Sequence, residues 1–114
     1  MEECIFCKIV RKDIPSDCLY EDHQVFAFRD INPQAPVHIL VIPKQHIESL
    51  LEVTEETSSL LANVAMVVKK LAKQLNVDES GFRLVVNTGK DGGQTVNHLH
   101  FHLLGGRELG WPPG

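Results

Sequence analysis

Three histidines alternate with apolar residues near the end of the sequence, in the run His98-Leu99-His100-Phe101-His102-Leu103-Leu104. Successive side chains of a β-strand point to opposite faces, so this spacing places all three imidazoles on one face of a strand. The pattern predicts a strand over residues 98–104 that is apolar on one face and titratable on the other. A face made only of titratable groups favours a functional site over an ordinary surface strand.

A three-histidine row also suggests a catalytic metal centre, in which three imidazoles hold zinc and leave one position for water. The predicted strand disfavours this alternative. At ~3.3 Å per residue, the Cα atoms of His98 and His102 lie roughly 13 Å apart, so one metal with bonds of about 2 Å would strain both side chains. We therefore expect adjacent histidines to act together and the outer two to have different roles.

The remaining pattern predicts a single α+β domain over residues 1–114. Apolar spacing predicts a short helix over residues 5–10 and a long helix that Thr54 caps and that runs to about Leu75. Apolar runs predict strands over residues 18–21, 25–29, 38–42 and 82–87, whereas residues 30–36 and 88–95 have loop composition. The connections are too short for parallel crossovers, so we expect an antiparallel sheet of about five strands with one long and one or two short helices.

Composition and charge narrow the classes of function. The 114 residues are 43% hydrophobic and 23% charged, as in an ordinary globular domain, and no apolar run approaches the ~18 residues of a membrane span. The net charge of −4 argues against a nucleic-acid polymer as ligand, because such binding needs a basic footprint. Three cysteines cannot all pair and no leader segment is recognised, so we expect a reduced, cytoplasmic protein.

The histidine run and several further motifs together resemble the HIT (histidine triad) superfamily. The further motifs are Asp30-Ile31-x-Pro33-Gln34-Ala35-Pro36, Val41-Ile42-Pro43-Lys44-x-His46-Ile47, Val85-Val86-Asn87, Asp91-Gly92-Gly93-Gln94 and Trp111-Pro112-Pro113-Gly114. They cover nearly the whole chain, and their combination is similar to the Hint branch of histidine triad nucleotide-binding proteins, which are purine nucleoside phosphoramidases. The nucleotidylyltransferase branch typically has Gln in place of His102, so the resemblance points to a hydrolase.

This resemblance implies the HIT-like fold, a homodimer and a hydrolase of purine nucleoside phosphoramidates (AMP or GMP conjugates) or related nucleotidyl conjugates. His100 would attack phosphorus and form a covalent nucleotidyl-histidine before a nucleoside monophosphate is released. His102 would bind the phosphate oxygens, His38 would take part in proton relay, and Thr95 would supply a hydroxyl where many relatives have Ser. The chemistry is consistent, because an imidazole that is largely neutral at pH 7 can attack phosphorus.

The same resemblance implies the other nucleotide contacts. Asp30 would accept hydrogen bonds from both ribose hydroxyls, although by residue type alone it is equally well a turn-capping residue. The glycines of the loop before the triad allow N–H groups to turn toward an anion. Phe6, Ile9, Phe28 and Ile31 would form an apolar pocket for the base, although each also fits an ordinary core. The implied set is Phe6, Ile9, Phe28, Asp30, Ile31, Asn87, Gly93, Gln94, Thr95, Val96, His100 and His102.

Cys4-x-x-Cys7 is compatible with half of a zinc site. Some bacterial members of the resembled family complete a structural zinc there with histidines that match His46 and His98. We therefore expect a structural zinc on these four residues and no metal in the chemical step. Cys18 has no partner in this scheme and is predicted to be buried.

Two rival functions remain open from the sequence. A dinucleoside polyphosphate hydrolase would use the same His100 with a different leaving group. A non-catalytic nucleotide-binding or partner-binding module would keep the triad for binding alone.

Overall fold

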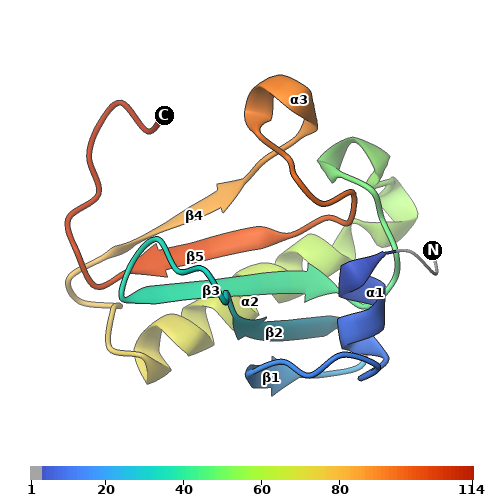
Figure 1. The fold of residues 1–114 in the computed structure, drawn as a ribbon, viewed down its shortest axis with the longest axis horizontal. Coiled ribbons are helices and arrows are strands. Elements are labelled where there is room, and N and C mark those ends of the chain that lie inside the picture. Colours follow the sequence, from blue (N-terminus) through green and yellow to red (C-terminus); the bar gives the residue numbers. More distant parts are fainter. Residues whose placement is uncertain (1–3) are drawn as a thin grey trace.

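A five-stranded antiparallel sheet with the order β1-β2-β3-β5-β4 forms the centre of the computed structural model, which describes residues 4–114 (Figure 1). The α+β prediction is confirmed. The strands are β1 Cys18–Glu21, β2 Val25–Arg29, β3 Val37–Pro43, β4 Phe82–Val86 and β5 Phe101–Gly105. The helices are α1 Ile5–Val10, α2 Ser59–Gln74 and α3 Gly89–Gly92, with short 3-10 turns η1 Leu50–Glu52 and η2 Glu55–Thr57.

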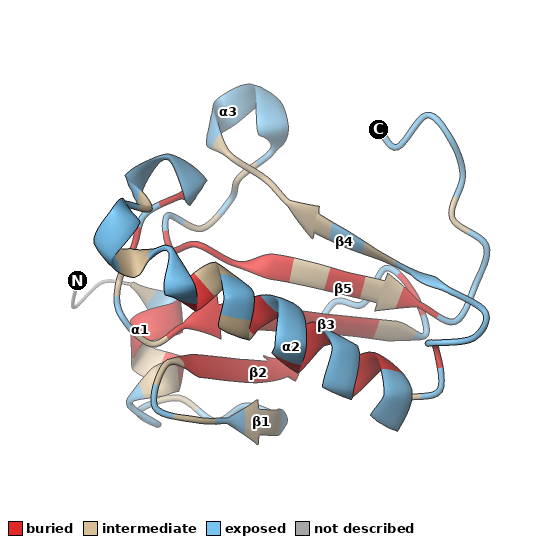
Figure 2. Ribbon diagram, turned by 180° about the vertical axis from the view of Figure 1, so that it is seen from behind, coloured by how far each residue is buried: buried red, intermediate tan, exposed pale blue. Residues whose placement is uncertain are grey.

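The two faces of the sheet are covered differently. The long helix α2 lies across one face, and the short helix α1 covers one end of the other (Figures 1 and 2). Alternation along β3 follows this division, since Ile39 and Val41 pack in the cluster with α2, whereas Leu40 and Ile42 pack in the cluster with α1. The rest of the α1 face is left for polar side chains.

The structure corrects the predicted C-terminal strand, because β5 begins at Phe101 rather than at residue 98. The ladder between β3 and β5 ends at the pair Val41–Phe101. Pro43, the next residue that would face β5, has no N–H to continue that ladder. Its carbonyl oxygen instead lies 2.8 Å from Nε2 of His98. Only His102 of the three histidines is therefore within the strand.

The alternation of the histidine run survives outside the strand. Leu99 and Phe101 are buried in the cluster with α2. On the opposite face the ring of Phe6 meets the rings of His98 and His100 edge-on, at centroid distances of 5.8 and 5.2 Å. All three imidazoles thus lie on the α1 side, as the spacing predicts.

Three further features differ from the sequence prediction. Thr54 caps the 3-10 turn η2 through a bond from its N–H to Thr57 Oγ1 (2.9 Å), and the long helix begins only at Ser59. The loop predicted over residues 88–95 contains the one-turn helix α3. Cys18 is exposed at the edge strand β1 rather than buried. Within residues 4–114, no helix has both the length and the apolar character needed to cross a membrane.

Candidate active site and metal cluster

The candidate active site lies on the α1 face of the sheet, where neighbouring strands bring imidazoles together. His38 is on β3, His102 is on β5, and His100 precedes β5 directly. The rings of His38 and His102 have centroids 5.2 Å apart, and those of His100 and His102 lie 5.0 Å apart. His38 and His100 are only 6% and 5% exposed. The structure therefore gathers the three predicted catalytic imidazoles, and it shields two of them from water.

Hydrogen bonding fixes which nitrogen of His100 is free to react. Nδ1 of His100 lies 2.7 Å from the main-chain oxygen of His98. A carbonyl oxygen can only accept, so Nδ1 carries the proton. The lone pair of neutral His100 is consequently on Nε2, which is the atom that can attack an electrophile.

The same reasoning orders His38 and His102. The N–H of Gln34 donates to Nδ1 of His38 over 3.0 Å, so the proton of neutral His38 is on Nε2. Nε2 of His38 lies 3.0 Å from Nδ1 of His102 and donates to it. His102 therefore carries its own proton on Nε2, as a donor available to an anion.

Burial keeps this relay neutral. Burial, reinforced by the neighbouring imidazoles of His100 and His38, lowers the pKa of His102 to about 4. Burial also lowers the pKa of His38, although the charge of Asp30 opposes that shift. At pH 7 the pair is uncharged, so the assignments made for neutral rings apply.

Asp30 lies beside the relay, with Oδ2 3.4 Å from Nε2 of His38. Its other oxygen, Oδ1, accepts from the N–H of Asn32 over 2.8 Å. Asp30, His38 and His102 also have ligand-type atoms within 4.8 Å of one another, as a metal site would require. A metal on Nε2 of His38 would remove the only proton of a ring whose Nδ1 already accepts from Gln34, leaving an imidazolate. His38 and His102 thus form a hydrogen-bonded pair beside the Asp30 carboxylate rather than a metal centre with it.

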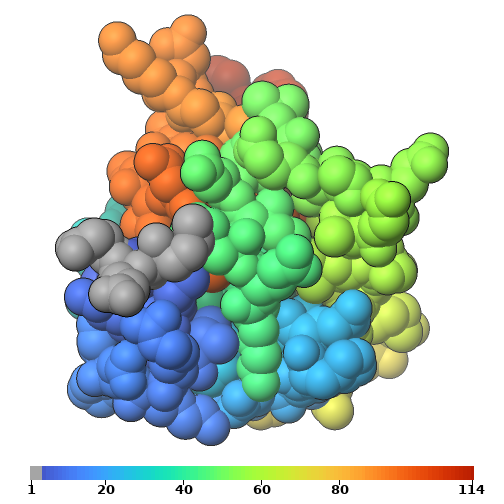
Figure 3. Space-filling model, turned by 90° about the vertical axis from the view of Figure 1, so that its right-hand side faces the viewer, coloured from blue at the N-terminus to red at the C-terminus, as the bar shows by residue number. Residues whose placement is uncertain are grey.

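A second cluster lies at the end of the molecule where α1, the segment after β3 and the segment before β5 meet (Figure 3). Ligand atoms of Cys4, Cys7, His46 and His98 all lie within 4.8 Å of one another. Cys7 Sγ is 3.3 Å from Nδ1 of His46, and Cys4 Sγ is 3.3 Å from Nδ1 of His98. Cys4 and Cys7 are three residues apart, about one helical turn, so both thiols lie at the same end of α1.

The donor set fits zinc. Two thiols and two imidazoles are the ligands of a tetrahedral structural site. Nε2 of His98 donates to the carbonyl of Pro43, which leaves Nδ1 unprotonated and oriented toward the cysteines. Burial lowers the pKa of His98 and so keeps its ring neutral, while burial and the neighbouring Cys4 raise the pKa of Cys7. A cation in the cluster would favour the thiolate that the raised pKa otherwise disfavours.

Three of the four apolar residues predicted to line the base lie together. Phe6 and Phe28 meet edge-on with centroids 5.7 Å apart, and Ile9 belongs to the same buried cluster. Val96 packs against its border. Ile31 is 99% exposed and lies outside the cluster, so the structure does not place it with the other three residues.

The loop before the triad is braced from within. The side chain of Gln94 accepts from Gly89 N–H (3.1 Å) and donates to the carbonyls of Glu48 (2.7 Å) and Val96 (3.0 Å). The N–H groups of Gly93 and Gln94 also donate inside the loop. Of residues 4–114, none accepts a hydrogen bond from the N–H of Thr95 or Val96, so these two amides are available to an anion.

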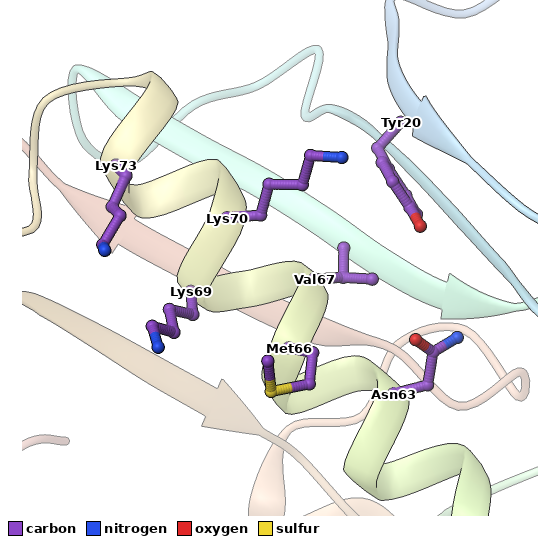
Figure 4. Close-up of a pocket in the computed structure, with 7 residues that line it drawn as sticks. All are labelled: Tyr20, Asn63, Met66, Val67, Lys69, Lys70 and Lys73. Carbon is purple, nitrogen blue, oxygen red and sulfur yellow. The ribbon is translucent and has the colours of Figure 1, made fainter.

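A cavity of about 380 Å³ lies away from this site, between α2 and Tyr20 of β1 (Figure 4). Nζ of Lys70 lies 5.1 Å from the centre of the Tyr20 ring. Figure 4 shows Lys69 and Lys73 pointing away from Tyr20. Because the ammonium groups do not converge, the cavity is not built to bind an anion.

Three contacts that orient the histidines come from main-chain atoms, the N–H of Gln34 and the carbonyls of Pro43 and His98. None of these roles is predicted by residue type. The only signal was their membership of motifs around the predicted loop and strand.

Comparison with known proteins gives a consistent result. A model of the HIT domain family matches residues 11–109. A HIT-like protein of Synechococcus elongatus is 59% identical over 113 residues, which cover 99% of this chain and 98% of that protein. A second HIT-like protein, from Synechocystis, is 49% identical over the same shares of the two chains.

Solved structures agree in fold. The crystal structure of a HIT family hydrolase from Legionella pneumophila is 51% identical with a TM-score of 0.96, covering 98% of this chain and 100% of that chain. A histidine triad nucleotide-binding protein from Candida albicans is 38% identical with a TM-score of 0.84, covering 96% of this chain and 83% of that chain.

Proposed function

This chain belongs to the HIT domain family, and from that premise we propose that it hydrolyses purine nucleoside phosphoramidates or related nucleotidyl conjugates through a covalent intermediate on His100. Relatives that match nearly its whole length are described as HIT family hydrolases. A relative of 38% identity is described as a nucleotide-binding protein. Nucleotide binding and hydrolysis are therefore supported at the level of the family. The bond that is cleaved is our proposal.

The observation that carries the proposal is the 2.7 Å contact between Nδ1 of His100 and the carbonyl of His98. It fixes the proton of the neutral ring on Nδ1 and leaves the lone pair on Nε2, an atom that requires no separate base before it attacks phosphorus. A binding module has no need of a fixed lone pair, since N–H donors serve a phosphate better.

In the proposed reaction, Nε2 of His100 forms a bond to the α-phosphorus while the P–N bond to the leaving amine breaks. The amine departs with the bonding electron pair and takes a proton from a neighbouring donor, a role that we give to the Thr95 hydroxyl. Water then attacks the nucleotidyl-histidine. The electron pair returns to Nε2, one proton of the water restores the donor, and a nucleoside monophosphate leaves.

The relay supplies the phosphate contacts in this scheme. Nε2–H of His102 donates to a phosphate oxygen, and His38 holds that tautomer by donating to Nδ1 of His102. The amides of Thr95 and Val96 are two further donors, and Asn87 follows the end of β4 nearby in sequence. Because His102 and His38 are neutral, the site favours an anion through directed dipoles rather than net charge.

Asp30 and the apolar cluster complete the proposed nucleotide site. A carboxylate can accept from both hydroxyls of a ribose. Phe6 and Phe28 supply an apolar wall suited to a flat purine, which favours AMP or GMP conjugates as substrates.

We propose that the protein is a homodimer, and the exposed edge of the sheet supports this. β4 is the last strand in the sheet, so one side of it has no partner strand among residues 4–114. Phe82 and Leu84 on β4 are 41% and 42% exposed. They line an apolar cavity of about 280 Å³ against Val68 of α2. A second copy is the simplest partner for such an edge.

We further propose a structural zinc held by Cys4, Cys7, His46 and His98. Such an ion would join α1 to the segment after β3 and the segment before β5. A filled tetrahedral ligand set leaves the ion no position for substrate. The three cysteines are free, which fits the reducing cytoplasm that we propose as the protein's location.

The decisive experiment traps the intermediate. A nucleoside phosphoramidate labelled at its α-phosphorus is mixed with the protein, the reaction is stopped in base within milliseconds, and peptides are analysed by mass spectrometry. The proposal expects one nucleotidyl group on the peptide that contains His100 and none in His100→Ala. Absence of adduct with undiminished turnover would refute the mechanism. Parallel turnover of a dinucleoside polyphosphate separates the two hydrolase alternatives, and no turnover of either would leave a binding module.

A further inference from the structure

Arg107 is exposed just beyond β5, yet all three of its guanidinium nitrogens are used on main-chain oxygens. Nε and Nη2 lie 3.2 and 3.0 Å from the carbonyl oxygen of Gln34, and Nη1 lies 3.0 Å from that of Glu108. No carboxylate among residues 4–114 forms an ion pair with Arg107. The side chain therefore joins the end of β5 to loop 30–36, across 73 positions of sequence.

Gln34 is bonded on its other side to the candidate active site. Its N–H donates to Nδ1 of His38 over 3.0 Å, while its side-chain amide donates to the carbonyl of Asn32 over 3.0 Å. One residue is thus held at its carbonyl by Arg107 and at its N–H by His38. The two groups lie in neighbouring peptide planes that meet at the Gln34 Cα, with only φ and ψ of Gln34 between them, so a shift of the carbonyl is transmitted in part to the N–H.

The backbone packing shows that this contact is built into the fold. Gly106 has φ +90°, and a Cβ at this position would lie 2.9 Å from Cβ of Pro36. The chain after β5 therefore passes directly against loop 30–36, where only glycine fits. The preceding residue, Gly105, is paired with Val37 in the sheet. The packing of Gly105 and Gly106 therefore fixes the position of the Arg107 backbone beside Gln34.

We propose that Arg107 is a positioning residue for the histidine relay. By holding the Gln34 carbonyl, Arg107 keeps the Gln34 N–H on Nδ1 of His38, and this contact fixes the Nε2–H tautomer of His38 that donates to His102. The catalytic consequence rests on the proposed function, whereas the tautomer is a property of the protein alone. A lysine cannot fully replace Arg107, because a single ammonium group lacks the planar set of N–H donors that reaches both the Gln34 and the Glu108 carbonyl.

The test reads the tautomer directly. Long-range ¹H–¹⁵N correlation spectra of the ¹⁵N-labelled full chain, at neutral pH and without substrate, report which nitrogen of each imidazole is protonated. We expect His38 of the parent to be protonated at Nε2 only. Arg107→Met should move both His38 nitrogens toward the values of a tautomer mixture, and Arg107→Lys should lie between the two.

Arg83 offers a matched control. Its Nη2 also donates to main-chain oxygens, those of Leu109 (3.3 Å) and Gly110 (2.8 Å), but Arg83 has no hydrogen bond to Gln34. Arg83→Met should leave the His38 signals at their parental positions. In turnover assays, Arg107→Met should lower kcat about 3- to 10-fold with KM nearly unchanged, whereas Arg83→Met should not.

Several outcomes would overturn the proposal. A parent in which His38 carries its proton on Nδ1 contradicts it without any mutation, so the test does not depend on a variant that folds. Unchanged His38 signals in a folded Arg107→Met or Arg107→Lys protein also overturn it, as does an equal loss of kcat in Arg83→Met. If the expected tautomers are seen but the parent hydrolyses no nucleotide, the proposed function is wrong, whereas the role of Arg107 in fixing the His38 tautomer is supported.

Discussion

The main-chain oxygen of His98 accepts a hydrogen bond from Nδ1 of His100 over 2.7 Å, while the ring of the same His98 reaches the thiol of Cys4. One residue therefore orients the proposed nucleophile with its backbone and contributes to the proposed metal site with its side chain. The two roles use different atoms. Changes to the metal ligands should consequently act on stability before they act on the chemical step.

The first prediction concerns the nucleophile. His100→Ala removes the atom that would bond to phosphorus, so phosphoramidate turnover should fall by about 10³-fold or more. Nucleotide binding, measured by titration calorimetry, should remain detectable because the other contacts persist. His23→Ala is the control, since His23 is an exposed turn residue and its loss should leave turnover unchanged. Substantial activity in His100→Ala would remove this residue from the mechanism.

The second prediction concerns the ribose. Asp30→Ala should weaken binding of a ribonucleotide by ~1.5–3 kcal/mol, the range for hydrogen bonds to a charged group, or about 10- to 150-fold in Kd. A 2′,3′-dideoxyribonucleotide should bind the variant and the parent equally. Asp30 also contacts His38 at 3.4 Å. Equal weakening for both ligands would therefore assign Asp30 to the relay instead of the ribose.

The histidine run shows what local sequence can predict. Leu99 and Phe101 lie in the α2 cluster and the imidazoles on the other face, even though β5 begins only at Phe101. Alternation is a property of extended backbone and does not need a paired strand. The boundary was missed because Pro43, on another strand, ends the ladder there. A one-turn helix such as α3 is likewise too short to show helical periodicity.

The missed contacts share a different cause. Arg107 reaches Gln34 across 73 positions, and Gln94 reaches Glu48 across 46. Both side chains bind main-chain carbonyls, which every residue possesses, so no partner residue type marks the contact. The residue pattern predicted that His100 and His102 share one face, and the family resemblance added His38, whereas the atoms that set their tautomers became visible only with the fold.

The third prediction concerns acid stability. An unfolded His102 has a pKa near 6.5, whereas burial and the neighbouring imidazoles lower it to about 4 in the fold. As the pH falls from 6.5 to 4, the unfolded chain gains a proton that the folded chain does not, so the free energy of unfolding decreases. The full shift corresponds to ~3 kcal/mol, and partial exposure reduces this to roughly 1–2 kcal/mol.

Urea unfolding at pH 7 and pH 4.5 measures this loss. His102→Gln removes the titrating group but keeps a polar side chain, so the variant should lose roughly 1–2 kcal/mol less than the parent between the two pH values. If both proteins lose stability equally, the lowered pKa of His102 does not account for the loss of stability at low pH.

The fourth prediction concerns Asp22, which joins the β1–β2 turn to α2. Burial alone would raise its pKa, but hydrogen-bond donors outweigh burial and hold it at about 2. The donors are Tyr20, Gln24, Val25 and Asn63. Asp22→Ala should lower the free energy of unfolding at pH 7 by ~2–3 kcal/mol, and the parent should lose this contribution as the pH falls from 3.8 toward 2.

A matched carboxylate tests whether these bonds matter. Asp13 forms an exposed ion pair with Arg11 at 3.0 Å. Asp13→Ala should change stability by less than ~0.5 kcal/mol in the same denaturation experiment. Similar effects of the two substitutions would show that the network around Asp22 contributes no more than a surface pair.

The fifth prediction concerns the metal. A zinc on Cys4, Cys7, His46 and His98 would connect three segments that lie far apart in sequence, so chelation should lower the melting temperature. The double variant Cys4→Ser with Cys7→Ser should lose stoichiometric zinc, as elemental analysis would show. It should still hydrolyse phosphoramidate at low temperature, because His100 is oriented by the carbonyl of His98 and not by its ring.

A control separates loss of metal from loss of a cysteine. Cys18 is exposed and lies outside the cluster, so Cys18→Ser should retain both zinc and melting temperature. Parent protein that contains no zinc after incubation with excess Zn²⁺ under reducing conditions would contradict the site. Complete inactivity of a folded double variant would show instead that the metal acts in the chemical step, since the fixed Nδ1 proton of His100 alone would not then suffice for attack.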